Sequence, residues 1–168
     1  AAIAAGVLIN TAGLLQAQAQ QTGAETTSEV SDILEVGSVV GEASTTTPAN
    51  ITKINASLKL SAGSDPINVS EASYTLANSK NATIVNGNPK VETGIKYVLR
   101  QGVKDTSTTI SDQGNFIVIQ FNLTNISGID PIEPGSQVTI ITESPAGGQS
   151  YKQARAPEQV KPSNSYIL

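Results

Sequence analysis

The chain has 168 residues, and its 10 basic and 14 acidic side chains give a formal net charge of −4. That length fits one domain with an appendage and can bury a sizeable core. No cluster of Lys and Arg forms a patch that could neutralise several phosphates, which argues against a nucleic-acid partner. Cysteine and histidine are both absent, which excludes thiol catalysis, serine–histidine–aspartate triads and the usual zinc sites.

Hydroxyl side chains are in excess, with 18 Ser and 17 Thr against 24 charged residues. A surface solvated by hydroxyls and amides suits an exported, glycosylated protein. It is equally typical of a β domain whose exposed strand faces carry Thr. Both interpretations stay open and are compatible.

The first element in chain order is an apolar segment at residues 1–15, in which Asn10 and Thr11 are the only polar residues. Apolar side chains at three-to-four spacing, with Ala, Leu and Gln dominant, predict a helix that continues to about Ile33 or Leu34. Fifteen helical residues rise about 22 Å, less than the roughly 30 Å of a bilayer's hydrocarbon core. The segment therefore cannot span a membrane as it stands, although a preceding apolar stretch would extend it.

This helix is apolar on all sides over its first turns, and the first charged residue is Glu25. The core helix of a globular domain is normally amphipathic, so an all-round apolar helix needs lipid or other helices. A single β domain cannot surround it, and we therefore expect burial by other copies of the chain. Small residues permit close helix approach, and Gly6 and Gly13 lie near one face. The residues expected to carry self-assembly are Ile3, Gly6, Val7, Leu8, Gly13, Leu14 and Leu15.

Short strands follow the helix. Apolar residues alternate with polar ones from Lys53 to Leu60, which predicts a half-buried strand. Further strands are expected at 73–76, 82–85, 94–100, 116–121 and 137–142. Their spacing, with turns between, predicts an antiparallel sandwich. The fold class expected is α+β, with a long N-terminal α-helix (residues 1–34) followed by an immunoglobulin-like β-sandwich domain (residues 35–168).

Two details of the sandwich can be specified further. The strand Phe116–Phe121 is apolar at every position except Gln120, so we expect a central strand buried on both faces. Asn86-Gly87 is a dipeptide typical of a hairpin turn. The core is expected to rest on Leu58, Leu60, Val98, Ile117, Ile119, Val138 and Ile140.

Asn-x-Ser/Thr sequons are the next pattern, and six occur, all of them outside the helix. The composition alone gives roughly 2.5 by chance, so the set is a moderate excess. Such sequons accept N-linked glycans on the surface of exported proteins. The candidate glycosylation sites are Asn50, Asn55, Asn68, Asn81, Asn122 and Asn125.

Catalytic and metal-binding patterns are sparse. Asp112 with Asn115, and Asp130 with Glu133, could offer oxygen ligands to a cation, but neither pair matches the spacing of an EF-hand loop and both read more simply as turns. No carboxylate pair stands in an acid–base context, and no phosphate-binding glycine loop is present. We therefore expect no enzyme activity, no cofactor, no metal site and no small-molecule substrate.

The first 23 residues, AAIAAGVLINTAGLLQAQAQQTG, carry a family resemblance. The block AAGVLINTAGLLQ resembles the N-terminal helix of archaellins, the archaeal flagellins, particularly in its haloarchaeal form. The segment Thr22–Val30 fits the same pattern. Further on the similarity is looser, at residues 103–121, 134–139 and 157–168. The resemblance is thus specific at the N-terminus and only general in the sandwich.

The resemblance implies an extracellular helical filament, whose core is made of N-terminal helices and whose outside is covered by immunoglobulin-like domains. A membrane motor rotates such filaments for swimming, and glycans are usual on the outer domains. In the family, a further apolar stretch follows a prepilin-peptidase-type cleavage point. We therefore expect that this chain lacks the first part of the helix, and that the longer form sits in the membrane before assembly.

Two qualifications accompany the resemblance. Some archaellins carry a metal site at an Asp-x-Asp motif, but this chain has Phe121-Asn122-Leu123 at that place, so no metal is carried over. The alternative function is an adhesive archaeal type IV pilin or a cell-surface binding module with the same helix-plus-sandwich plan. Such a module needs a binding face, and the six aromatic residues of the chain do not cluster.

Overall fold

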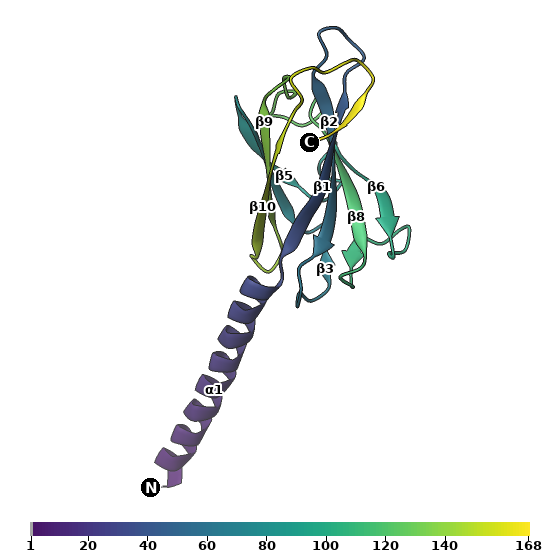
Figure 1. Ribbon diagram of the computed structural model, residues 1–168. Helices are drawn as coiled ribbons and strands as arrows, with labels where there is room; N and C mark the ends of the chain where they lie inside the picture. The colour runs from purple at the N-terminus through teal and green to yellow at the C-terminus, as the bar shows by residue number, and fades with distance from the viewer. Residues whose placement is uncertain (1) are drawn as a thin grey trace.

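The computed structural model describes residues 2–168, and its helix α1 stands away from an antiparallel β-sandwich like a stalk (Figure 1). Helix α1 spans Ala2–Ser31. The longer strands are β1 Leu34–Ala43, β2 Ile51–Leu60, β4 Ser73–Asn78, β5 Ala82–Asn86, β6 Ile95–Gln101, β8 Phe116–Asn122, β9 Gln137–Glu143 and β10 Gln149–Arg155. The short strands are β3 Ile67–Asn68, β7 Thr109–Ile110 and β11 Ser165–Ile167.

The C-terminal end of α1 differs slightly from the prediction. The helix ends at Ser31, before the expected end at Ile33 or Leu34, and the backbone N–H of Asp32 donates its bond to the Ser28 carbonyl at 2.8 Å. Leu34 is instead the first residue of β1 and is completely buried in the sandwich. Apolar spacing cannot separate a last helical leucine from a first strand leucine, because both are buried positions.

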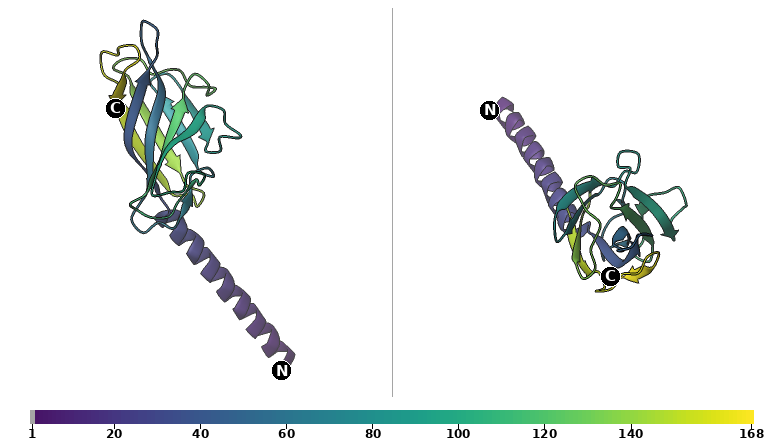
Figure 2. Two further views of the ribbon diagram at one scale, coloured as in Figure 1. Left: turned by 90° about the vertical axis from the view of Figure 1, so that its right-hand side faces the viewer. Right: turned by 90° about the horizontal axis from the view of Figure 1, so that it is seen from above.

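Two sheets face each other in the described residues, with strand orders β11-β1-β2-β8-β6 and β10-β9-β4-β5, and β3 pairs with β7 in a small third sheet (Figure 2). All of these pairings are antiparallel. The expected fold class, an N-terminal helix followed by an antiparallel β-sandwich, is confirmed. The β1–β2 loop, residues 44–50, lies at the end of the sandwich opposite α1 (Figures 1 and 2).

The six strands predicted from the sequence all exist, and they correspond to β2, β4, β5, β6, β8 and β9. Strands β1, β3, β7, β10 and β11 were not predicted. Strand β10 has the sequence QSYKQAR and forms the edge of its sheet, where alternate side chains face solvent. An edge strand needs few apolar residues, so its hydrophobic pattern is weak.

Side chains from both sheets fill the core. Six of the seven residues predicted for it are buried: Leu58, Leu60, Ile117, Ile119, Val138 and Ile140. The prediction for Val98 is wrong, because its side chain is 42% exposed. The register between β6 and β8 shifts between Tyr97 and Leu99, so Val98 is the extra residue of a β-bulge. The bulge breaks the alternation on which the prediction depended.

Strand β8 is central, as predicted, because it pairs with β2 on one side and β6 on the other. It is not buried on both faces, however. Its inward side chains Ile117, Ile119 and Phe121 are fully buried, whereas Phe116 and Val118 on the other face are only half-buried. Helix α1 points away from that face and does not cover it (Figure 1).

The prediction of a hairpin at Asn86-Gly87 is also wrong. Strand β5 pairs with β4, whereas β6 pairs with β8 in the other sheet, so the chain crosses between sheets after Asn86. The Gly87 N–H donates to the Ala72 carbonyl at 3.0 Å. A Cβ at Gly87 would lie 2.7 Å from that same oxygen. The glycine is therefore required by close backbone approach and not by a two-residue turn.

Candidate assembly helix and modification sites

Helix α1 leaves the sandwich with its side chains uncovered. Every described side chain from Thr11 to Thr27 is exposed, and Leu14 exposes 64% of its surface. This stretch contains no basic residue, and Glu25 is its only acidic one. It also carries four Thr and four Gln, so it is nearly uncharged but not wholly apolar. A helix with neither an apolar face packed on its own domain nor many charged side chains is only marginally stable alone in water. The surface is therefore suited to contact with other helices.

Gly13 and Gly23 of α1 pack against nothing within the described molecule. A Cβ added at Gly13 or at Gly23 would meet nothing within 4 Å. Glycine also weakens a helix by about 1 kcal/mol relative to alanine. The cost has no compensation inside the chain, whereas a second helix could approach closely at these points.

The predicted assembly residues are only partly described. Gly13, Leu14 and Leu15 lie on the exposed part of α1. The side chains of Ile3, Gly6, Val7 and Leu8 fall outside the described residues, although the backbone there is helical. Within the part of the chain that the structure describes, no helix is both long enough and apolar enough to cross a membrane.

Residues 28–34, called the neck here, join α1 to the sandwich and are held from one side by the β2–β3 loop. The Ser64 hydroxyl donates a 2.7 Å hydrogen bond to the carbonyl of Ser31. The Asp65 N–H donates to Asp32 Oδ1 at 2.8 Å. The carbonyl at the helix end and the buried carboxylate therefore both have partners.

The neck is held from its other side by β9, β10 and the turn between them. The hydroxyls of Thr142 and Ser150 both donate to the carbonyl of Leu34. A Cβ at Gly148 would clash with the backbone carbonyl of Asp32. Loops from both sheets thus fix the direction in which α1 leaves the sandwich. Sequence reasoning missed this joint, because its members are separated by up to 116 residues.

All six sequons lie in the sandwich part of the chain, and none of their asparagines is fully buried. A glycan attaches to the side-chain nitrogen, Nδ2, so the partners of that atom matter. In three sequons Nδ2 donates to a carboxylate: Asn55 to Glu42 at 2.7 Å, Asn68 to Glu71 at 2.6 Å and Asn81 to Asp130 at 3.1 Å. Hydrogen bonds to charged acceptors are the stronger ones, so these three amides are held in place.

The other three sequons present Nδ2 more freely. No hydrogen bond from Nδ2 of Asn50, Asn122 or Asn125 occurs among the described residues, and Asn125 is exposed. The Thr124 hydroxyl donates to Asn122 Oδ1 at 2.7 Å, which orients that amide. The structure thus separates the six sequons into two equal classes that the sequence pattern does not distinguish.

The oxygen-rich turns do not assemble into a cluster. The Asn115 N–H donates to the Asp112 carbonyl at 3.0 Å and closes a turn. Glu133 forms an ion pair with Lys80 at 2.6 Å, and Asp130 Oδ2 accepts a hydrogen bond from Asn81 Nδ2. Among the described residues no group of three acidic side chains is placed to hold a metal ion.

A family model for archaeal-type flagellin matches residues 1–151. The chain belongs to the archaeal-type flagellin family. Flagellin B1 of Natrialba magadii is 30% identical over 165 residues, covering 94% of this chain and 81% of the relative. Flagellin B2 of Halobacterium salinarum is 28% identical over 169 residues, covering 100% of this chain and 86% of the relative. This flagellin is therefore a structural subunit of an extracellular archaeal filament.

Solved structures support the fold of this flagellin. The archaeal flagellum of Methanospirillum hungatei strain JF1 is similar with a TM-score of 0.73 at 12% identity, covering 99% of this chain and 90% of that chain. The crystal structure of flagellin FlaB1 from Methanocaldococcus jannaschii is similar with a TM-score of 0.62 at 17% identity, covering 82% and 96% respectively. The first match covers both the helix and the sandwich, and neither comparison favours an adhesive module.

Proposed function

We propose that this flagellin builds its filament by packing the α1 helices of many subunits into a common core, with the sandwiches outside, and that the filament serves swimming. Residues 1–34 form the core part and residues 35–168 the outer part. The observation that carries the proposal is the exposed, nearly uncharged surface of α1 from Thr11 to Ala24. A helix with such a surface is stabilised when other helices cover it.

The energetics of packing favour this arrangement. Burying a leucine side chain such as Leu14 or Leu15 contributes about 1.5–3 kcal/mol. The first 24 residues carry no charged side chain, so close packing of several helices desolvates no ionised group. An isolated helix of this kind is only marginally stable. Assembly would therefore order the helix and bury it in one step.

The membrane is the second proposed environment of the subunit, before assembly. The support is the same uncharged N-terminal segment, which is compatible with lipid as well as with other helices. We also propose that the subunit has no catalytic role, no cofactor and no small-molecule substrate, as fits a structural filament family. Turnover of any substrate in a broad hydrolase screen would contradict this part of the proposal.

Replacement of Gly13 by leucine tests the helix-packing core. The new side chain meets nothing in the free subunit and favours the helix by roughly 1 kcal/mol, so the thermal midpoint should not fall. In a packed core it blocks close helix approach, and filaments and swimming should both be lost in the native organism. Electron microscopy of cells and swimming assays give the readout.

The matched control for Gly13→Leu is Gly114→Leu, because a Cβ at Gly114 also meets nothing within 4 Å but stands on the sandwich surface. This variant should assemble and swim. Filaments of normal number and width from Gly13→Leu would overturn the helix-packing proposal, because the substitution leaves the free subunit intact.

We also propose that the outer domain carries N-linked glycans, mainly at Asn50, Asn122 and Asn125. The support is the free Nδ2 atom at these positions, whereas Asn55, Asn68 and Asn81 donate to carboxylates. Mass spectrometry of protein from the native organism should find glycan on at least two of the six sequons, with the free class more occupied. Wholly unmodified protein would contradict the proposal, and equal occupancy of both classes would indicate that glycans are added before the domain folds.

A further inference from the structure

Charge is distributed unevenly along the chain. The first 52 residues contain no Lys or Arg and five acidic residues, two of which, Glu25 and Glu29, stand on the last turns of α1. Residues 90–104 have the opposite character, with four basic residues and one acidic residue. Acidic residues are thus present near the C-terminal end of α1 and basic residues gather on and around β6, although the net charge of the chain is only −4.

These charges are not neutralised within the described molecule. Its ion pairs join Lys53 to Glu42, Lys59 to Glu35, Lys80 to Glu133 and Arg155 to Glu158. None of them uses Glu25, Glu29 or a basic residue of 90–104. The sandwich thus pairs charges elsewhere on its surface but leaves these two sets with no partner of opposite sign.

The basic residues lie on and around β6, the outer strand of its sheet, among exposed apolar side chains. We call this surface the basic edge, and it consists of Lys90, Val91, Lys96, Val98, Leu99 and Lys104. All six of these side chains are exposed. Beside them, the Arg100 guanidinium lies 5.7 Å from the centre of the Tyr97 ring and donates to the Ser107 carbonyl at 2.9 Å. The edge is therefore a firm surface of mixed apolar and cationic character.

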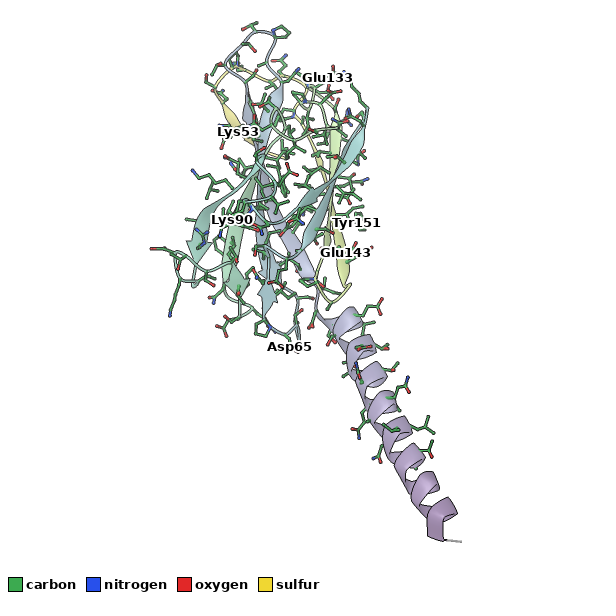
Figure 3. All side chains as sticks on the ribbon, turned by 180° about the vertical axis from the view of Figure 1, so that it is seen from behind. Lys53, Asp65, Lys90, Glu133, Glu143 and Tyr151 are labelled. Atoms are coloured by element: carbon green, nitrogen blue, oxygen red, sulfur yellow. The ribbon has the colours of Figure 1, made fainter. Side chains whose placement is uncertain are left out.

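The acidic residues of the stalk base lie elsewhere on the molecule. We call Glu25 and Glu29 the acidic collar, because both are exposed where α1 approaches the sandwich. In Figure 3, Lys90 lies on one flank of the sandwich, and Glu143 and Tyr151 lie on the opposite flank. The turn that follows β9, on the flank of Glu143, is the one that approaches Glu29, since a Cβ added at Gly147 would lie 3.3 Å from that side chain. The basic edge of one molecule is thus directed away from its own collar.

We propose that the basic edge of one subunit docks against the acidic collar of a neighbouring copy in the filament. Two different surfaces that complement each other make a head-to-tail contact, and repetition of such a contact builds an open helical assembly. This inference rests on the proposed filament function and adds a second contact, between outer domains and stalk bases, to the helix core. Docking neutralises both charge sets and covers the apolar side chains between the lysines.

Protection of an edge strand is the simpler explanation of part of this surface. Lysines and bulges on edge strands prevent unwanted pairing with other sheets, and β6 has both. That explanation accounts for Lys96 and for the bulge at Val98. It does not account for the exposed Val91 and Leu99, and it gives no reason for unpaired carboxylates on α1. A docked neighbour accounts for the lysines, the exposed apolar side chains and the unpaired carboxylates together.

Charge reversal of the two surfaces in separate proteins tests the inference. The edge variant carries Lys96→Glu and Lys104→Glu, and the collar variant carries Glu25→Lys and Glu29→Lys. Each variant alone presents two surfaces of like sign and should not dock with itself. In an equimolar mixture, each edge again meets a collar of opposite sign. Sedimentation velocity at low salt should show association of the mixture, which is lost at roughly 0.5 M salt because the charges are screened.

A third variant provides the matched control. Lys152→Glu with Lys161→Glu gives the same net charge as the edge variant and changes two other lysines that form no ion pair among the described residues. It keeps the basic edge and the acidic collar, so by itself it should associate as strongly as the original protein. The edge variant by itself should associate at least tenfold more weakly, although the two variants carry the same net charge.

Equal self-association of the edge variant and this control variant would overturn the docking inference, and so would an edge–collar mixture that associates no more than either of its components alone. Residues 11–24 of α1 are the same in every variant, so packing of that part of the helix cannot produce a difference between the variants. A negative result would therefore leave the helix-packed filament standing, whereas failure of the Gly13→Leu test would leave the docking result standing. Circular dichroism of each variant checks that the sandwich is folded.

Discussion

Leu14 on α1 is 64% exposed, whereas Leu58 on β2 is 0% exposed. A leucine of the sandwich is thus buried by the rest of its own chain, whereas a leucine of α1 can be buried only by another molecule. Substitutions in the sandwich should therefore change the free energy of unfolding of a single subunit. Substitutions in α1 should leave that quantity unchanged and alter assembly. The following predictions test this division on one scale, the free energy of unfolding of the free subunit.

The largest effect is expected from Phe121→Ala. The Phe121 ring is fully buried and packs edge-on against Tyr74, with 5.5 Å between ring centres. Its removal leaves a cavity and should lower the free energy of unfolding by about 3–5 kcal/mol in urea denaturation. The matched change on the helix, Leu14→Ala, should shift it by less than about 0.5 kcal/mol. Comparable losses from the two variants would show that α1 is part of the folding core.

An intermediate effect is expected from Gly148→Ala at the joint between the two regions. The added methyl group would meet the backbone carbonyls of Asp32 and Glu29, which cannot rotate away as a side chain could. Overpacking of this kind costs about 1–3 kcal/mol, and urea denaturation should register it. Small-angle scattering should also detect a changed angle between helix and sandwich. Gly114→Ala, where the methyl group enters open space, serves as the control; an unchanged angle in Gly148→Ala would show that the joint tolerates the shift.

The smallest effect is expected from Tyr97→Phe, and it depends on pH. The Tyr97 hydroxyl has one proton, which it shares between the Gly87 carbonyl at 2.7 Å and the Val69 carbonyl at 3.0 Å, so its loss should cost about 1 kcal/mol near neutral pH. Burial raises the pKa of both Tyr97 and Tyr74 above the ordinary value of about 10. The folded state therefore holds these protons more tightly than the unfolded state does.

The sign of the pH effect follows from these raised pKa values. The stability associated with the buried phenols is fully present below pH of about 10, where both states are protonated. It declines as the pH rises above that value, because the unfolded chain ionises first. Urea denaturation between pH 8 and pH 11 should show a steeper loss for the original protein than for Tyr97→Phe. Parallel curves would mean that Tyr97 ionises without cost in the folded state.

The contrast between the two regions could largely be predicted from the sequence. The uncharged run before Glu25 predicted a helix that its own β domain cannot cover, and the alternation from Lys53 to Leu60 predicted a half-buried strand. Strand β1 could not be predicted, because Gly37 and Ser38 interrupt its apolar pattern at an irregular register. Val98 was misplaced, because a one-residue bulge reverses every side chain after it.

The candidate site was predictable to the extent that it is local in sequence. The six sequons and the residues of α1 can be read directly from short patterns. Two of the three carboxylates that distinguish the sequons are not local, since Asn55 meets Glu42 across 13 residues and Asn81 meets Asp130 across 49. The third, Glu71, is three residues from Asn68. The joint at Leu34 depends in the same way on Thr142 and Ser150. Such contacts appear only once both sheets are in place.

The β1–β2 loop has a practical consequence for watching filaments move. It lies at the end of the sandwich opposite α1 (Figure 1), and its Thr45 is exposed. Because the chain contains no cysteine, Thr45→Cys would give every subunit a single thiol for a maleimide dye, far from α1. A filament labelled in this way would carry one fluorophore per subunit at a uniform radius, so its rotation could be followed by light microscopy in swimming cells.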